Sequence, residues 1–232
     1  MLFTIGNPKT QKGEARGYLT AVLHLAPHEL AGVGNMCPRA TAGCIAMCLN
    51  TAGRGGIFKA GATTNAVQEA RKRRTREYMA DPDVFAARLM ADVIRLRKRA
   101  NRMGLTLAVR VNGTSDQPRL ARRLALAFPD VQFYDYTKLP APWLRELPNY
   151  HMTFSLSERN KNDAAAALRN GISVAVVFST RKGKALPAYF AGRKVIDGDA
   201  HDLRFLDPRG VIVGLRAKGR ARRDTSGFVV QV

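Results

Sequence analysis

Two stretches in the first half of the chain repeat apolar residues with the period of an α-helix. They predict helices over residues 65–80 and 84–103, separated by Asp81-Pro82, because a proline disrupts a helix interior. The second stretch has an apolar face made of Phe85, Leu89, Val93, Leu96 and Met103. A different face of the same stretch carries Arg88, Arg95, Arg99 and Arg102. The pattern is typical of an amphipathic helix that covers a core.

Beyond Gly104 the pattern changes to short apolar runs that each end in polar residues. Together with an earlier run at 19–26 they predict seven strands, the other six lying within 107–116, 131–138, 151–160, 174–183, 194–202 and 211–219. Helical patterns at 118–128 and 162–170 separate several of these runs. Strands that alternate with helices predict parallel pairing through right-handed crossovers.

We therefore expect a single α/β domain over residues 1–232, folded as an incomplete TIM-like (βα) barrel. The connections near 181–194 and 202–210 have too irregular a hydrophobic pattern to predict regular helices. We therefore expect the barrel or sheet to be incomplete. Residues 1–18 form an N-terminal extension in this interpretation. A cysteine-containing loop at 35–56 follows the first strand.

Polar side chains follow the predicted strands, and ligands of α/β proteins bind beyond the carboxyl ends of the strands. The candidate catalytic residues at these ends are Asn112, Asp135, Lys138, Glu158, Asp199 and Lys218. Each of them taken alone is also a common turn or helix-capping residue. Their occurrence at successive strand ends favours a shared site.

The three cysteines of the chain, Cys37, Cys44 and Cys48, all lie in the loop at 35–56. A disulfide would leave one thiol over and is rare inside cells. Three unrelated buried cysteines would pack as small hydrophobes. A structural zinc site normally takes four protein ligands with CxxC spacing, which is absent here, although a zinc with an open position needs fewer.

An iron–sulfur cluster is the fourth interpretation and the one we favour. Cys44 and Cys48 are four residues apart, so on a helical turn both thiolates face the same way, and Cys37 returns from the other side of the loop. Three thiolates can hold three irons of a [4Fe–4S] cluster and leave the fourth iron open. Arg39 and Arg54 would bind near this cofactor and offset its negative charge.

The charge of the chain points to an anionic partner. The formal net charge is +20 over 232 residues, and a surplus of this size favours nucleic acid or nucleotide as the partner. Arginine-dense helical segments at 69–78 and 95–102 are candidates to contact phosphates. No apolar run reaches the ~20 residues that span a bilayer, and no signal-peptide pattern is present, so we expect a cytoplasmic protein without a membrane partner.

A three-cysteine loop after the first strand of an α/β barrel resembles the layout of radical S-adenosylmethionine enzymes. In those enzymes the loop carries a CxxxCxxC pattern and the fourth iron binds S-adenosylmethionine. Here the pattern is C-x6-C-x3-C, which departs at both intervals. The resemblance implies S-adenosylmethionine as a second cofactor, and it covers the loop and the general architecture only.

A resemblance to a second family spans most of the chain. The segments CPRATAGCIAMCLNTAGRGG, VRVNGTSD, VQFYDYTK, NYHMTFSLSE, VIDGDAHDLRFLDP and VIVGLRAKG are similar to the core blocks of a family of uncharacterised bacteriophage and prophage proteins with a domain of unknown function. This resemblance implies expression in the cytoplasm of an infected bacterium. It supplies no reaction.

Two functional hypotheses follow. In the first, the protein is a cluster-dependent enzyme that acts on a nucleic acid or nucleotide. In the second, it is a non-enzymatic basic nucleic-acid-binding protein whose cluster or zinc site only orders a loop. Polar strand ends that converge on an open iron favour the first hypothesis, and diffuse basic charge around a fully ligated metal favours the second.

Overall fold

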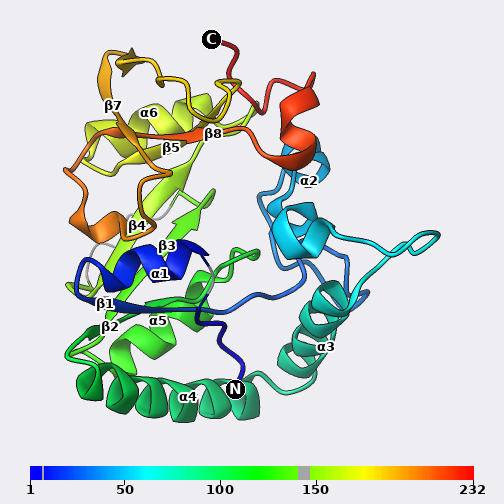
Figure 1. Ribbon diagram of the computed structural model, residues 1–232, viewed down its shortest axis with the longest axis vertical. Helices are drawn as coiled ribbons and strands as arrows, with labels where there is room; N and C mark the ends of the chain where they lie inside the picture. Colours follow the sequence, from blue (N-terminus) through cyan, green and yellow to red (C-terminus); the bar gives the residue numbers. More distant parts are fainter. Residues whose placement is uncertain (7, 141–146) are drawn as a thin grey trace.

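The computed structural model describes residues 1–6, 8–140 and 147–232. Within these residues an eight-stranded sheet forms the centre of the molecule, in the order β1-β2-β3-β4-β5-β8-β7-β6 (Figure 1). The strands are β1 (Tyr18–Val22), β2 (Thr106–Arg110), β3 (Gln132–Thr137), β4 (Tyr150–Ser155), β5 (Val174–Phe178), β6 (Tyr189–Phe190), β7 (Arg193–Asp197) and β8 (Ile212–Arg216). Neighbouring strands pair in parallel, apart from the antiparallel β6–β7 pair. The predicted α/β class and parallel pairing are confirmed.

The sheet is open, so the predicted TIM-like barrel is not confirmed. Strands β1 to β5 follow the chain order, but β8 then pairs with β5 and separates it from β7. The cause lies in the irregular connection after β5, where β6 and β7 form a hairpin through Ala191 and Gly192, both at positive φ. Such a two-residue turn reverses the chain within the sheet, where a crossover helix would continue the winding of a barrel.

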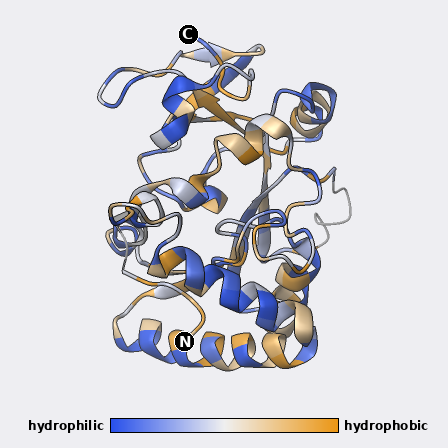
Figure 2. Ribbon diagram, turned by 90° about the vertical axis from the view of Figure 1, so that its right-hand side faces the viewer, coloured by the Kyte–Doolittle hydropathy of each residue, from blue (hydrophilic) through white to orange (hydrophobic). Residues whose placement is uncertain are grey.

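The four long helical patterns of the sequence are confirmed. The helices are α3 (Ala66–Ala80), α4 (Pro82–Arg102), α5 (Pro118–Ala127) and α6 (Lys161–Arg169). Asp81 ends α3 and caps α4, because its side chain accepts hydrogen bonds from the backbone N–H groups of Asp83 and Val84. Figure 2 shows α4 along the bottom of the molecule, with hydrophilic and hydrophobic bands in alternation.

Successive side chains along each strand pack on opposite faces of the sheet. On one face Leu19 and Leu107 belong to the same core cluster as Leu89 of α4 and Leu120 of α5. The other face carries the N-terminal helix α1 (Pro8–Glu14) and the short 3-10 helix η4 (Arg204–Leu206). There Leu203 packs with Ala108 and Tyr134. Burial on both faces is the normal condition of a parallel sheet.

The pairing of β4 with β5 is short, like that of β2 with β3. It joins Phe154 with Val174 and Ser155 with Ala175, and the backbone N–H of Leu156 also donates to the Ala175 carbonyl. Beyond this point the C-terminal segment approaches β5, where Phe178 forms a parallel bridge with Val230. A second core cluster, which includes Phe154, Val176 and Ala167 of α6, lies on this side of the molecule.

The predicted cysteine loop lies at the carboxyl edge of the sheet. It contains α2 (Ala42–Ala46) and the 3-10 helices η1 (Leu49–Thr51) and η2 (Gly53–Gly56). The backbone N–H of Asp116, beyond β2, donates to the carbonyl of buried Met36, which ties the start of the loop to the strand ends. The C-terminal 3-10 helix η5 (Gly219–Arg223) lies beside η1 and α2 (Figure 1).

None of the helices in the described part of the chain has the length and apolarity of a membrane-spanning helix.

Candidate functional site at the carboxyl edge of the sheet

The three thiols lie on three successive pieces of the loop. Cys37 follows the buried Met36, and its Sγ lies 3.8 Å from the carbonyl oxygen of Thr114. Cys44 lies within α2, and Cys48 caps η1, where its Sγ accepts from the backbone N–H of Asn50 at 3.5 Å. All three are free and partly buried. The thiols are therefore held by local structure without being closed off from the surface.

Glu158, a predicted catalytic residue, anchors the start of α2. Its Oε1 accepts from the backbone N–H of Gly43 at 2.9 Å, and its Oε2 accepts from the Thr41 hydroxyl at 2.8 Å. The same hydroxyl oxygen accepts from the N–H of Cys44 at 3.2 Å. A carboxylate suits this position because it takes two donors from the first turn of a helix. The structure therefore gives Glu158 a positioning role toward Cys44.

The thiols interact electrostatically with one another. Burial, together with smaller contributions from the charges of Cys48 and Cys44, raises the pKa of Cys37 to about 12. Burial also raises the pKa of Cys48, and a Cys44 thiolate adds to that effect. Each thiolate would therefore disfavour the others, so all three become thiolates together only when a cationic group compensates them.

Two cations already offset part of this charge. Lys138 and Arg71 both lower the pKa of Cys48. Lys138 lies beyond β3, where its Nζ donates to the Ser155 hydroxyl at 3.2 Å and its backbone N–H donates to Asp116 Oδ2 at 2.9 Å. Arg71 of α3 donates from Nη1 to Asn50, at 2.6 Å to Oδ1 and 3.1 Å to the carbonyl oxygen.

The predicted cofactor-binding arginines do not make these contacts. Arg39 and Arg54 are exposed on the loop. Their role beside a cofactor stays a prediction, and the cations that lower the pKa of Cys48 are Lys138 and Arg71, which is 9% exposed. Arg71 belongs to the arginine-dense segment 69–78, and nothing in the sequence distinguishes it from the arginines around it.

Asn112, just beyond β2, and Asp135, within β3, form a buried pair. Asp135 Oδ1 accepts from the backbone N–H of Asn112 at 2.7 Å, and Oδ2 accepts from the Asn112 amide at 3.0 Å and the Tyr150 hydroxyl at 2.9 Å. Burial raises the pKa of Asp135 to about 7, although these donors oppose the shift. The contacts join three neighbouring strands.

Asp199 and Lys218 pair with each other at the ends of β7 and β8. Lys218 Nζ lies 2.5 Å from Asp199 Oδ1, and Arg216 Nη1 lies 3.3 Å from Asp199 Oδ2. Arg216 also donates to both carboxylate oxygens of Asp197. Of the six predicted catalytic residues, the contacts join Lys138 and Glu158 to the cysteine loop, whereas the other four pair among themselves.

No three or more His, Cys, Asp or Glu side chains among residues 1–6, 8–140 and 147–232 form a group that could hold a metal ion. This finding applies to zinc and to iron alike. The thiols interact electrostatically in pairs, and both metal interpretations of the loop stay predictions.

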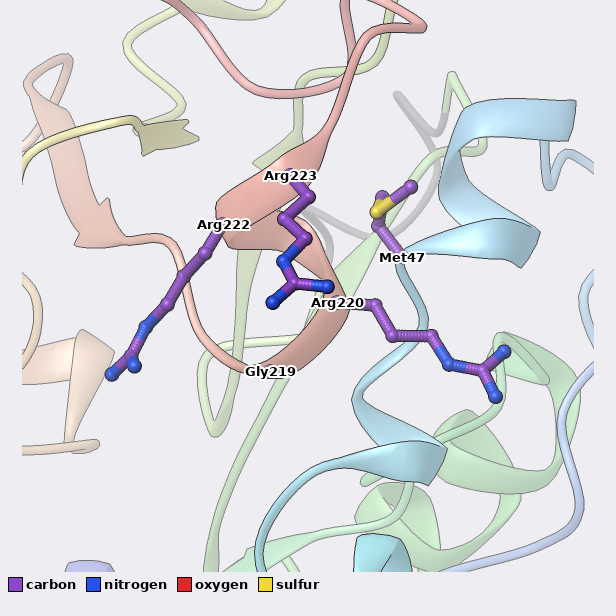
Figure 3. Close-up of a pocket in the computed structure, with 5 residues that line it drawn as sticks. All are labelled: Met47, Gly219, Arg220, Arg222 and Arg223. Atoms are coloured by element: carbon purple, nitrogen blue, oxygen red, sulfur yellow. The ribbon is translucent and has the colours of Figure 1, made fainter.

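A cationic cleft that the sequence pattern does not predict adjoins the cysteine loop. A cavity of about 480 Å³ is lined by Met47 and by Gly219, Arg220, Arg222 and Arg223 of η5 (Figure 3). Met47 lies between Cys44 and Cys48 in the chain. A second cavity of about 450 Å³ shares Arg222 and Arg223 and is lined further by Ser179, Thr180, Arg181, Lys182 and Ala217. The available signal was the GRARR run after the last predicted strand.

A family model described as Gene product 88 matches residues 1–232. No curated protein and no solved structure matches the sequence. The family match agrees with the resemblance of the sequence blocks to a family of phage proteins. Because the match covers every residue of the chain, the protein belongs to the Gene product 88 family.

Proposed function

We propose that the protein binds one [4Fe–4S] cluster through Cys37, Cys44 and Cys48, leaves the fourth iron open, and acts as an enzyme on a nucleic acid or nucleotide. The observation that carries the proposal is the meeting of three partly buried, mutually interacting thiols at the carboxyl edge of a parallel sheet. This edge is where α/β proteins bind their ligands. The sequential order of β1 to β5 is also that of an open barrel.

The spacing of the cysteines in the sequence favours a cluster over a single ion. In a cubane each thiolate binds a different iron, so the sulfur atoms lie farther apart than the ligands of one zinc ion. The cysteine pattern C-x6-C-x3-C also lacks the CxxC spacing that is typical of structural zinc sites. Free thiols also suit the cytoplasm, where we place the protein, in the host if the gene is phage-borne.

The residues around the thiols have distinct roles in this proposal. Glu158 and Thr41 hold α2 so that Cys44 faces the other thiols, and Arg71 and Lys138 offset the charge of bound thiolates. When bound, the cluster would supply an iron that acts as a Lewis acid, an electron donor or an anchor for a second cofactor. Lys138 is the charged group best placed to meet a substrate there, because its Nζ forms no ion pair within 4.0 Å in the described part of the chain, where it lies over the Phe228 ring and donates to Ser155.

Purification without oxygen tests the cluster. We expect brown protein with about four irons and four sulfides per chain, and loss of iron in Cys44→Ser and Cys48→Ser. Met47→Leu is the matched control, since Met47 lies between these cysteines and should leave the iron content unchanged. Stoichiometric zinc without iron, in protein from iron-replete cells, would contradict the proposal.

The spectrum of the reduced cluster tests the open iron. We expect addition of S-adenosylmethionine or a nucleotide to change the electron paramagnetic resonance signal, and Lys138→Met to alter this response while the iron content stays intact. An unresponsive signal with every added molecule would instead make the cluster structural. The protein would then be the second candidate, a non-enzymatic basic nucleic-acid-binding protein, which the net charge of +20 favours.

A further inference from the structure

The turn η5 presents three arginines to solvent. Arg220, Arg222 and Arg223 are exposed, whereas Ala221 between them is only 6% exposed. Ala221 packs in a cluster with Ala217 and Val229, against which Met47 of the cysteine loop also lies. Figure 3 shows Arg220 and Arg222 extending to opposite sides of the turn, with Arg223 between them. A buried alanine therefore fixes the directions in which the arginines leave the surface.

The segment after η5 holds the turn in place. Asp224 is 9% exposed, and its carboxylate accepts from the Ser226 backbone N–H at 3.0 Å, the Ser226 hydroxyl at 2.6 Å and the Val229 N–H at 2.8 Å. Val230 then joins the end of β5, because its N–H donates to the Val177 carbonyl at 2.8 Å. Ordering the turn before a ligand arrives lowers the entropy cost of binding.

The end of β5 supplies the facing wall of the cleft. Ser179 is tied to the same segment, since its N–H donates to the Val230 carbonyl at 2.9 Å. The next residues, Arg181 and Lys182, are exposed and line the cavity that shares Arg222 and Arg223. One hydrogen-bonded segment therefore supports both basic walls.

Among the described residues, the cations of the cleft lack neutralising partners. Within the described ranges, no ion pair or side-chain hydrogen bond involves the five cationic side chains that line it, Arg181, Lys182, Arg220, Arg222 and Arg223. The neighbouring carboxylates are used elsewhere, since Asp197 and Asp199 pair with Arg216 and Lys218. Like charges collected on a rigid surface repel each other, and a bound polyanion would remove that cost.

We propose that this cleft binds consecutive phosphate groups of one ligand and directs the rest of that ligand toward the thiols. Arginine suits phosphate because its planar fork donates two parallel hydrogen bonds. Two adjoining cavities that share Arg222 and Arg223 fit linked phosphates, as in a nucleoside triphosphate or a nucleic-acid backbone. Met47 joins the cleft to the cysteine loop. This inference adds a ligand class to the proposed function. The role of that ligand as a substrate rests on the proposed function.

Calorimetric titration of the full chain tests the cleft with three probes, which are inorganic tripolyphosphate, ATP and a short single-stranded oligonucleotide. The variant Arg222→Gln/Arg223→Gln should weaken binding at least about tenfold. The matched control, Arg169→Gln/Arg209→Gln, removes the same charge from exposed positions outside the cleft and should weaken tripolyphosphate binding less than about twofold. Tight binding of tripolyphosphate and ATP would identify a nucleotide ligand, and binding of the oligonucleotide alone would identify a nucleic-acid backbone.

Equal weakening by the two double variants, or unchanged binding of every probe by the η5 variant, would overturn the inference. Circular dichroism confirms that each variant is folded. Iron content, measured on the same samples, separates this inference from the proposed function. Failure of the cluster proposal leaves arginine-dependent binding in protein without iron, whereas failure of the cleft leaves the iron content intact.

Discussion

At residue 43 the chain has no room for a side chain. A Cβ added to Gly43 would lie 2.4 Å from the Ser226 hydroxyl and 2.9 Å from both carboxylate oxygens of Glu158. Gly43 and Ser226 are far apart in sequence, so this one position joins the cysteine loop to the C-terminal segment. The absence of a side chain at residue 43 therefore allows the cysteine loop and the C-terminal segment to pack against each other.

We predict that Gly43→Ala destabilises the protein by about 1–3 kcal/mol, because Glu158 or Ser226 must move and give up hydrogen bonds. Thermal unfolding measures the effect, and iron content should fall with it if α2 is displaced. Ala42→Ser at the exposed neighbouring position is the control. A Gly43→Ala protein with the melting temperature of the wild type would show that the two segments do not meet this closely.

Asp135 gives the stability a characteristic pH dependence. Its pKa rises from 3.8 to about 7 on folding because the carboxyl is buried. The folded state therefore holds a proton that the unfolded state releases between these values. The stabilisation from this proton is complete below about pH 4 and is lost as the pH rises through about 7.

We predict that Asp135→Asn removes this component. The free energy of unfolding of the wild type, minus that of the variant, should fall as the pH rises from 4 to 7, by at most about 1.4 kcal/mol per pH unit. Chemical denaturation at several pH values measures the two free energies. Their difference cancels the contributions of the buried histidines, which are present in both proteins. A difference that stays constant or grows with pH would mean that the carboxyl is buried in its charged form.

Some residues of the site can be predicted from the sequence and others cannot, for physical reasons. The cysteines were visible because their chemistry and clustering are local. Glu158 and Lys138 were located as strand-end residues, but the pairing of Asp199 with Lys218 arises only when β8 lies beside β7. Arg71 was hidden among similar arginines, since burial is decided by the helix face that packs against Asn50.

At the scale of the element, the helices and strands followed from periodicity, but the strand order did not. The runs at 174–183, 194–202 and 211–219 contain β5, β7 and β8 as predicted. The position of β8 between β5 and β7 depends on tertiary pairing, which the hydrophobic pattern of a strand does not encode. The helix α1 and the two-residue strand β6 were missed because short elements carry little periodic signal.

We predict at this scale that Asp224→Ala weakens phosphate binding in the cleft by about threefold or more, because the turn η5 loses the acceptor that orders it. The substitution makes the chain more positive, so a purely electrostatic attraction would instead tighten binding. Calorimetry with tripolyphosphate distinguishes the two outcomes. Thermal unfolding, run on the same protein, confirms that the variant is folded at the temperature of the titration.

At the scale of the whole molecule, the basic surplus is divided between distant regions. The helix α4 lies along one end of the molecule, and η5 lies near the other end, beside α2 (Figure 1). On α4, Arg95 pairs with Asp92, whereas Arg99 and Arg102 are exposed. The net charge alone predicted an anionic partner, but only the folded arrangement shows where arginines line a cavity.

The parts of the carboxyl edge come from distant positions in the chain, so the ribosome makes them at different times. A ribosome makes the cysteine loop soon after β1, well before Asp116, Lys138 and Glu158, the residues that later hold or face it. At about 5–20 residues per second, a nascent chain exposes three untethered thiols for several seconds. The arginines of η5 emerge after every strand of the described sheet. During synthesis the thiols are therefore open to oxidation before the rest of the site exists. The arginines that would bind phosphate are completed last.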